Sequence, residues 1–378
     1  MSTASEPVAP PNPAAVPAPT ARLTWLDTFR GLSIAMVVLG HVLGGLAFAA
    51  FVPEPAKERL WFAYDLLYTF RMPALFLASG LFAARSLKRG LPRFLGDKAR
   101  TLAYPYLIWS LISWGGLSLA AGMANNQADP MAPLKMLYDP MMGVWFLYVL
   151  FVVMTCFGLW SAIGGGAAGF LAVGAVLHAA VPMWAGAPSM LVQVGRFSVY
   201  FGLGLVLAEH VRGIGERLSP GRLALLVPTA FAMMKGAVML GWADHPVLDV
   251  VPALCGTLGM FGAAMLLDRL AAAEALRHFG RHSLQLYVAA GHASVATRLM
   301  LQRGMGVEAL PVHILLGTAA GLAGPLLLVA ITRAVGFRYL FTWPRPGDEQ
   351  RPADRSEPGR SREAVGRGRG RVAGVSAP

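Results

Sequence analysis

Charged residues are scarce in this sequence. Asp, Glu, Lys and Arg make up 14% of its 378 residues, whereas a soluble domain usually contains about 25%. Hydrophobic residues make up 56% of the chain. Long apolar stretches with so few charges require lipid rather than water as the surrounding solvent. The shortage of charge therefore excludes an ordinary soluble domain and predicts a membrane protein.

Cysteine is also rare. The two cysteines, Cys156 and Cys255, both lie inside apolar runs, and neither belongs to a CxxC pair or to a Cys/His arrangement with metal-ligand spacing. A buried free cysteine behaves as a small hydrophobic residue. We therefore expect both to be core residues, and we expect no metal site and no bound cofactor.

Both ends of the chain lack the composition of a folded segment. The first twenty residues are rich in Ala, Pro, Ser and Thr and contain no apolar core of a signal peptide. We therefore expect a disordered leader over residues 1–21. Residues 341–378 are rich in Arg, Gly and Pro, and we expect a disordered basic tail that contacts anionic lipid head groups rather than nucleic acid. The membrane domain is then expected over residues 22–340.

Hydrophobic segments fill this membrane domain. Each is close to the length of about 20 residues that a helix needs to cross the hydrocarbon core, so we predict an all-α bundle of about ten transmembrane helices. The boundaries within 143–208 are the least defined, because the links between these segments are short and uncharged. The predicted spans are 30–50, 62–84, 102–121, 143–161, 165–185, 190–208, 222–241, 247–267, 284–301 and 309–332.

Basic residues are concentrated in alternate loops. The loops 85–100, 209–222 and 268–282 each contain three or more Lys or Arg residues, and the loops between them contain few or none. Loops rich in Lys and Arg stay in the cytoplasm. This alternation predicts a multi-pass protein of the inner (plasma) membrane with both termini in the cytoplasm. We find no clear internal repeat, which disfavours an inverted-repeat transporter.

The first predicted span carries two polar residues on one face. Arg30 and His41 are eleven residues apart, which is within about 20° of a whole number of helical turns and about 16 Å along the axis. Arg30 would lie at the cytoplasmic end, within reach of Asp27, and His41 would lie near the middle of the bilayer. This arrangement suits an anion bound at Arg30 and a titratable base deeper inside. The alternative is a snorkelling arginine and a histidine bonded to a neighbouring helix.

Two other spans contain polar candidates. Arg71 lies in the middle of its span, followed by Pro73 and Ser79, and an ionisable group at that depth is a functional hypothesis by default. The alternative is a structural arginine that bonds backbone carbonyls freed by the proline. His292 and Tyr287 lie in the ninth span, and a histidine satisfied within the bundle is an equally good interpretation there.

An ordered set of motifs over residues 22–335 resembles the acyltransferase-3 family of integral membrane acyltransferases, which are O-acetyltransferase-like. The arginine and histidine separated by ten residues are that family's signature. The motifs, in chain order, are Leu26-Asp27-x-x-Arg30-Gly31 with His41, the stretch from Met72 to Gly80, Lys98-x-Arg100 with Tyr104-Pro105-Tyr106 and Trp109, Trp145-Phe146-Leu147-Tyr148, and Gly280-x-x-Ser283 with Tyr287 and His292.

The resemblance implies transfer of an acyl group, most often acetyl, from cytoplasmic acyl-CoA to a hydroxyl of a glycan or another envelope molecule. It also implies that His41 is the catalytic residue and that Arg30 contacts the donor. The chain departs from the family pattern at Arg71, where family members commonly carry a histidine. The arginine pair expected near the third span has two candidates here, Arg85-x-x-Lys88 and Lys98-x-Arg100.

These residues support one mechanistic hypothesis. Arg30 and the loop residues Arg85, Lys88, Lys98 and Arg100 attract the phosphates of acyl-CoA. His41 acts as a general base toward the acceptor hydroxyl or accepts the acyl group itself, and Arg71 stabilises the oxyanion. We expect Asp27, Ser79, Tyr287 and His292 to complete the donor site.

Two other classes of function remain open. A transporter or exporter of a small or lipid-linked substrate could use Arg30, His41 and Arg71 as a substrate path. A catalytically silent membrane scaffold would keep the fold without the chemistry. The acceptor is also open among a capsule or lipopolysaccharide sugar, a periplasmic glucan and a small molecule.

Overall fold

The computed structural model describes residues 23–119, 129–140, 143–211, 214, 218–270, 273–337 and 339–344. These residues form helices, turns and loops, and no strand occurs among them. The expected leader lies outside the described residues, as do most of the expected tail and part of the basic loop 209–222.

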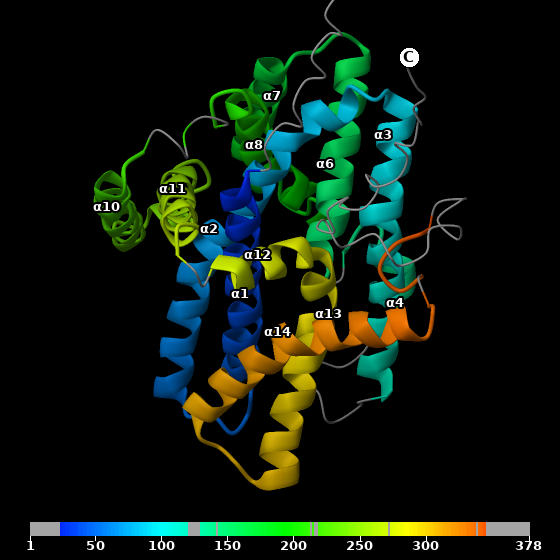
Figure 1. The fold of residues 1–378 in the computed structure, drawn as a ribbon, viewed down its shortest axis with the longest axis vertical. Helices are drawn as coiled ribbons and strands as arrows, with labels where there is room; N and C mark the ends of the chain where they lie inside the picture. Colours follow the sequence, from blue (N-terminus) through cyan, green and yellow to red (C-terminus); the bar gives the residue numbers. More distant parts are fainter. Residues whose placement is uncertain are drawn as a thin grey trace, which may run out of the picture.

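One long helix overlaps each predicted span (Figure 1). Three shorter helices, α3 (Leu91–Lys98), α5 (Ala132–Lys135) and α12 (Ala273–Arg281), lie between them. The long helices are α1 (Thr24–Ala47), α2 (Glu54–Leu87), α4 (Tyr104–Leu119), α6 (Trp145–Ala162), α7 (Ala167–Ala180), α8 (Ser189–Leu207), α10 (Pro220–Met239), α11 (Val250–Leu267), α13 (Ser283–Leu299) and α14 (Leu310–Ala334).

Seven of these helices are long and apolar enough to cross a membrane, namely α1, α2, α6, α8, α10, α11 and α14. At one end of each of the other three, α4, α7 and α13, the backbone continues as a π- or 3₁₀-helix. The uninterrupted α-helix is shorter there for that reason. The prediction of an all-helical, multi-pass membrane protein is supported, while the count of ten spans and the cytoplasmic position of the termini stay predictions.

The first helix lies inside the bundle. Helix α1 packs against α2, α11, α12, α13 and α14, and most of its residues are buried. Near its start, the ring of Phe29 stacks on Phe261 of α11 with 4.3 Å between ring centroids. A helix that is buried nearly all round can carry polar side chains at membrane depth, because neighbouring helices shield them from lipid.

Glycines let α2 and α8 approach closely. A Cβ atom added at Gly80 would overlap the backbone of Phe201, and one added at Gly204 would overlap the backbone of Leu77. Small residues at membrane helix contacts allow such close packing. Because Gly80 meets Gly204 near the ends of both helices, α2 and α8 run parallel. Helix α8 therefore begins at the same end of the bundle as α2.

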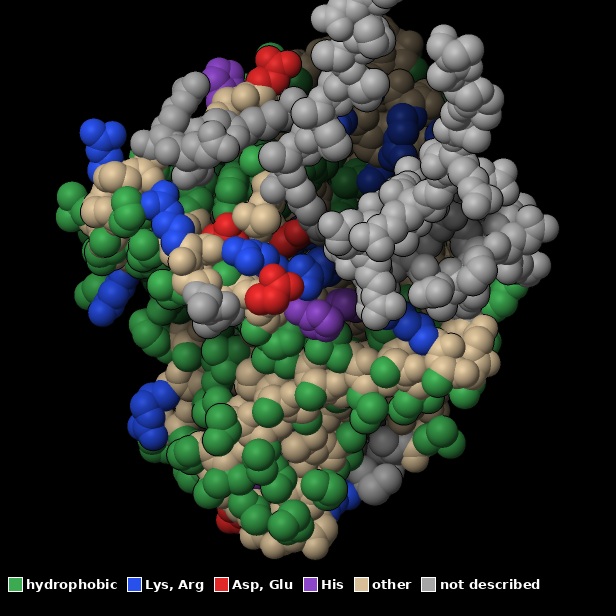
Figure 2. Space-filling model, viewed as in Figure 1, with side chains coloured by type: hydrophobic (Ala, Val, Ile, Leu, Met, Phe, Trp, Pro, Cys, Tyr) green, Lys and Arg blue, Asp and Glu red, His purple; other side chains and the backbone are tan. Residues whose placement is uncertain are grey.

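Charged side chains gather over α12 on the face shown in Figure 2, and the surface over α13 and α14 is largely apolar and uncharged. Asp268 connects this charged region to α1. Its carboxylate accepts hydrogen bonds from the hydroxyls of Thr24 at 2.7 Å and Thr28 at 2.6 Å, and from Nε of Arg277 at 2.8 Å. Burial acts to raise the pKa of Asp268, but these hydrogen bonds outweigh it and hold the pKa below its usual value.

The stability of the fold should therefore fall in acid. A carboxylate whose pKa is depressed by folding stabilises the protein above its unfolded pKa, about 3.9 for aspartate. That contribution is lost as the pH falls through the lower, folded pKa. Thermal unfolding of the detergent-solubilised protein, measured from about pH 7 down to about pH 3, should show this loss. The Asp268→Asn variant should be less stable than the wild type at neutral pH, and its stability should fall less as the pH is lowered. The same dependence of stability on pH in both proteins would contradict the prediction.

Candidate functional site

Three of the predicted site residues, His41, Arg71 and Tyr287, line one cavity of about 270 Å³, which we call the His41 cavity. They come from α1, α2 and α13, so residues far apart in the chain meet at one place. The full lining is Val37, His41, Tyr64, Tyr68, Arg71, Met72, Asp139, Pro140, Trp145, Ser189, Gln193 and Tyr287.

The His41 side chain is half-buried and borders the cavity. Val37, one turn earlier on the same face of α1, also lines it. Neither ring nitrogen of His41 has a hydrogen-bonding partner within the described part of the chain. His178 differs, because its two ring nitrogens lie 2.7 Å from an Asp249 carboxylate oxygen and 2.8 Å from the carbonyl oxygen of Arg196. The His41 imidazole is therefore available to a substrate.

Arg71 is 3% exposed and points from α2 toward α1. Its guanidinium occupies the space that a side chain at Gly40 would need, and Nη1 donates to the carbonyl of Met36 at 3.4 Å. The guanidinium carbon lies 5.0 Å from the centroid of the Tyr64 ring and 5.2 Å from that of Tyr68. Glycine at position 40 thus brings the charge next to His41.

The charge of Arg71 is incompletely compensated. Among the described residues no carboxylate pairs with it, and its buried Nε has no hydrogen-bonding partner. Placing an arginine at membrane depth costs about 3 kcal/mol or more, and each cation–π contact returns about 0.5 to 2 kcal/mol. The carbonyl that accepts a hydrogen bond from Arg71 lies in α1. It is not one of the α2 carbonyls that Pro73 was expected to free. The remaining positive charge favours negative charge that develops in the cavity.

Tyr287 is fixed at the cavity wall by α6. Its hydroxyl accepts a hydrogen bond from the backbone N–H of Phe146 at 3.3 Å, and the two rings pack with their centroids 5.4 Å apart. Trp145, which precedes Phe146 and is the first residue of α6, also lines the cavity. Tyr287 therefore positions α13 against α6 beside the space that a substrate would occupy.

His292 lies outside the cavity lining, although it interacts electrostatically with His41. Its Nε2 is 3.1 Å from the Ser113 hydroxyl of α4, and its ring lies 5.4 Å from that of Trp109. This hydrogen bond to a neighbouring helix is what the structural interpretation of His292 requires. Its role as a donor contact stays a prediction.

Arg30 lies at the start of α1, at the end of the bundle where α2 finishes. Its exposed guanidinium donates a hydrogen bond to the Ser283 hydroxyl at 2.8 Å, which joins α1 to the first turn of α13. Lys98 interacts electrostatically with Arg30, and its ammonium lies 5.5 Å from the centroid of the Phe94 ring. Burial lowers the pKa of the Lys98 amine. Arg30 and Lys98 thus form a basic region, separate from the His41 cavity.

The other predicted donor contacts are more dispersed. Arg85 and Lys88 are exposed near the end of α2, and Arg100 lies in the π-helix Ala99–Ala103 that leads into α4. Ser79 donates to the carbonyl of Leu75 in its own helix at 2.8 Å. Asp27 is 9% exposed and packs against α12, where a side chain at position 280 would overlap its carbonyl. None of these five lines the His41 cavity.

Two tyrosines that line the His41 cavity, Tyr64 and Tyr68, were not among the predicted site residues. Tyr64, Tyr68 and Arg71 are spaced four and three residues apart on α2, which places them on one helical face. That spacing was visible in the sequence and could have identified them. The contact of Ser189 with Asp139, whose carboxylate accepts a hydrogen bond at 2.6 Å, joins two segments fifty residues apart and had no local signal.

Comparison with known proteins gives one finding. A family model described as an acyltransferase domain, that of the acyltransferase-3 family, matches residues 23–330. The matched region begins one residue before α1 and ends within α14, so it contains the whole His41 cavity. No curated protein and no solved structure gives a significant match to the chain.

The contact between Gly40 and Arg71 can be tested by stability. A Gly40→Ala substitution should destabilise the protein by about 1–3 kcal/mol, because the added methyl group overlaps the guanidinium. In an Arg71→Met background the same substitution should cost much less, since coupled residues are not additive. Thermal unfolding in detergent measures both. Gly45→Ala in the same helix is the matched control, because nothing lies within 4 Å of a Cβ there; additive costs would show that the contact is absent.

Proposed function

Because the chain belongs to the acyltransferase-3 family, we propose that this membrane acyltransferase transfers an acyl group, acetyl first among the candidates, from cytoplasmic acyl-CoA to a hydroxyl of an envelope glycan or related acceptor. The observation that carries this proposal is an imidazole without a partner, His41, beside the buried guanidinium of Arg71 in one cavity. This pair supplies a base and a positive charge, the two groups that acyl transfer to a hydroxyl requires.

In the proposed reaction, His41 takes the proton of the acceptor hydroxyl as the oxygen attacks the thioester carbonyl carbon. Negative charge develops on the carbonyl oxygen, and the guanidinium of Arg71 stabilises it. The intermediate then collapses, the carbon–sulfur bond breaks, and the imidazolium returns the proton to the departing thiolate. The products are the acyl ester and free CoA. A covalent route, with His41 as acyl carrier, uses the same residues.

The donor is proposed to bind at the end of the bundle where α1 begins. Arg30 and Lys98 lie there with the exposed Arg85 and Lys88, and such groups bind phosphate oxygens through charge-assisted hydrogen bonds. Arg30 and His41 are eleven residues apart in one helix, which corresponds to about 16 Å. The extended pantetheine arm of CoA is a flexible chain suited to cover that distance, with the thioester at its inner end.

The acceptor is proposed to approach from the other end. The His41 cavity is also lined by Asp139 and Ser189, and Ser189 is the first residue of α8. Helix α8 begins at the end of the bundle opposite to Arg30, because it runs parallel to α2. Donor and acceptor groups would then meet at His41 from opposite sides. This arrangement supports transfer across the membrane, from a cytoplasmic donor to an acceptor on the outer side.

Replacement of His41 tests the proposal. Membranes that contain the wild type should incorporate radiolabelled acetyl from acetyl-CoA into an envelope glycan or lipid fraction. His41→Ala should lower this incorporation by about 10²- to 10⁴-fold, the usual contribution of a general base, while the amount of membrane-inserted protein stays the same.

The matched control is His210→Ala, since His210 is an exposed histidine away from the cavity. Membranes with this variant should incorporate as much radiolabelled acetyl as membranes with the wild type. Equal labelling in the wild type and His41→Ala, with succinyl-CoA and longer acyl donors as well as acetyl-CoA, would remove His41 from catalysis. That result would favour the interpretation of the protein as a transporter.

A further inference from the structure

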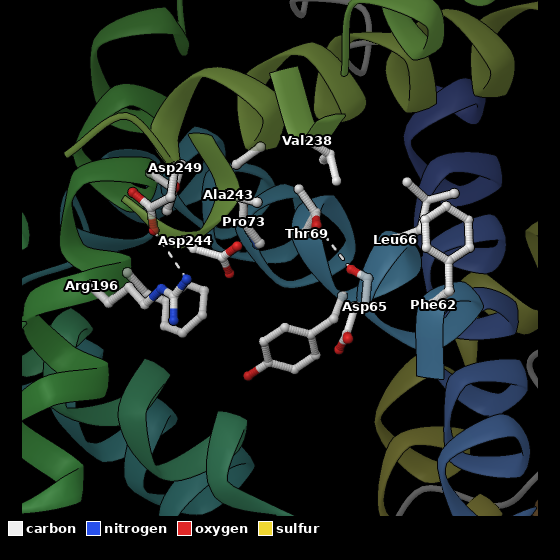
Figure 3. Close-up of a pocket in the computed structure, with 14 residues that line it drawn as sticks. Phe62, Asp65, Leu66, Thr69, Pro73, Arg196, Val238, Ala243, Asp244 and Asp249 are labelled. Atoms are coloured by element: carbon white, nitrogen blue, oxygen red, sulfur yellow. Dashed lines mark hydrogen bonds and ion pairs between the residues drawn. The ribbon is translucent and has the colours of Figure 1, made fainter. Parts of the chain in front are cut away.

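A second cavity, of about 310 Å³, adjoins the His41 cavity. Tyr68 lines both of them. We call this second space the Asp65 cavity; it lies between α2, α8, the end of α10 and the start of α11. Figure 3 shows Asp65 and Thr69 on one side of it, and Arg196, Asp244 and Asp249 on the other. The two cavities therefore have one wall residue in common, and both lie along the same stretch of α2.

The Asp65 cavity carries more negative than positive charge. The Arg196 guanidinium is paired with Asp249 at 3.0 Å, and Asp249 also contacts Nε2 of His178 at 2.7 Å. The carboxylates of Asp65 and Asp244 have no hydrogen-bonding or ion-pair partner in the part of the chain that the structure describes. Three carboxylates against one guanidinium leave an excess of acceptors. Such a surface attracts hydrogen-bond donors and repels anions.

A buried phenol in the same cavity also points to a polar ligand. Tyr200 lines the cavity and is 2% exposed. Within the described residues its hydroxyl has no hydrogen-bonding partner. This hydroxyl is not among the polar atoms that protein atoms enclose completely, so a molecule in the cavity can reach it. The aromatic faces of Tyr68, Tyr200 and Phe197 meanwhile provide flat apolar surface beside the carboxylates.

We infer that the Asp65 cavity binds the part of the acceptor next to the reacting hydroxyl, and that this part is a neutral or cationic polyol, such as a sugar ring without an acidic group. Asp65 and Asp244 accept hydrogen bonds from its hydroxyl or ammonium groups, and Tyr200 completes the set. The inference rests on the proposed acyl transfer. It adds a specificity that His41 and Arg71 do not provide, namely the exclusion of acceptors with a negative charge at this position.

The first test removes both unpaired carboxylates. The assay uses membranes that hold the full chain, and the acceptor is the envelope fraction that the wild type labels. The acceptor concentration for half-maximal acyl transfer should be at least 10-fold higher for the Asp65→Asn/Asp244→Asn variant than for the wild type. The acetyl-CoA concentration for half-maximal rate should be unchanged. Glu58→Gln is the matched control, because Glu58 is an exposed carboxylate of α2 outside the cavity. Thermal unfolding should show that all three proteins are folded.

The second test measures the charge preference with three small probes. Glucosamine, methyl glucoside and glucuronic acid are added as competitors of the labelling reaction. Glucosamine and methyl glucoside should inhibit the wild type at concentrations at least 10-fold lower than glucuronic acid does, and the double variant should lose this difference. Equal inhibition by all three, stronger inhibition by glucuronic acid, or no inhibition would overturn the inference.

The outcomes separate this inference from the proposed function. Labelling by the wild type with unchanged acceptor dependence in the double variant would overturn the role of the Asp65 cavity and leave acyl transfer standing. A parallel change in the dependence on acetyl-CoA would also overturn it. Absence of any His41-dependent labelling would overturn the proposed function, and the inference would fall with it.

Discussion

The structure depends on one physical constraint, which is a guanidinium buried among membrane helices. Arg71 is 3% exposed and lies against α1, where its guanidinium fills the space beside Gly40. Two tyrosine rings and one carbonyl stabilise the charge without cancelling it. Because a charge at membrane depth is costly, the surrounding helices must hold it tightly, and the same packing keeps His41 at the edge of a cavity.

The position of α1 follows from that constraint. It packs against five other helices, so His41 borders a cavity inside the bundle, while Arg30 is exposed at the start of the helix. Arg30 is joined to α13 through Ser283, and Asp268 ties the first turn of α1 to the turn before α12. The helix that carries the proposed base is therefore anchored at its basic end, while the His41 side chain keeps both ring nitrogens available.

The two cavities give the proposed reaction a direction. Basic side chains gather where α1 begins, and the His41 cavity reaches residues at the start of α8, near the opposite end. The Asp65 cavity adjoins it through Tyr68 and carries the opposite sign of charge from Arg71. A positive charge beside the reacting carbonyl and a negative surface beside the acceptor suit different parts of one transfer reaction. Electrostatics would thus separate the two substrates before chemistry begins.

The sequence by itself determined the class of the protein and part of its site. Apolar segments of about 20 residues form helices because lipid offers no partner for backbone N–H and C=O groups, and the spacing of Arg30 and His41 puts both on one face of α1. Only the tertiary structure decided that Arg71 lies against Gly40, that His292 bonds Ser113, and that Asp244 shares a cavity with Asp65. The physical reason is that these neighbours are brought together by packing between helices far apart in the chain, and helical periodicity defines which residues share a face without defining which helix that face will meet.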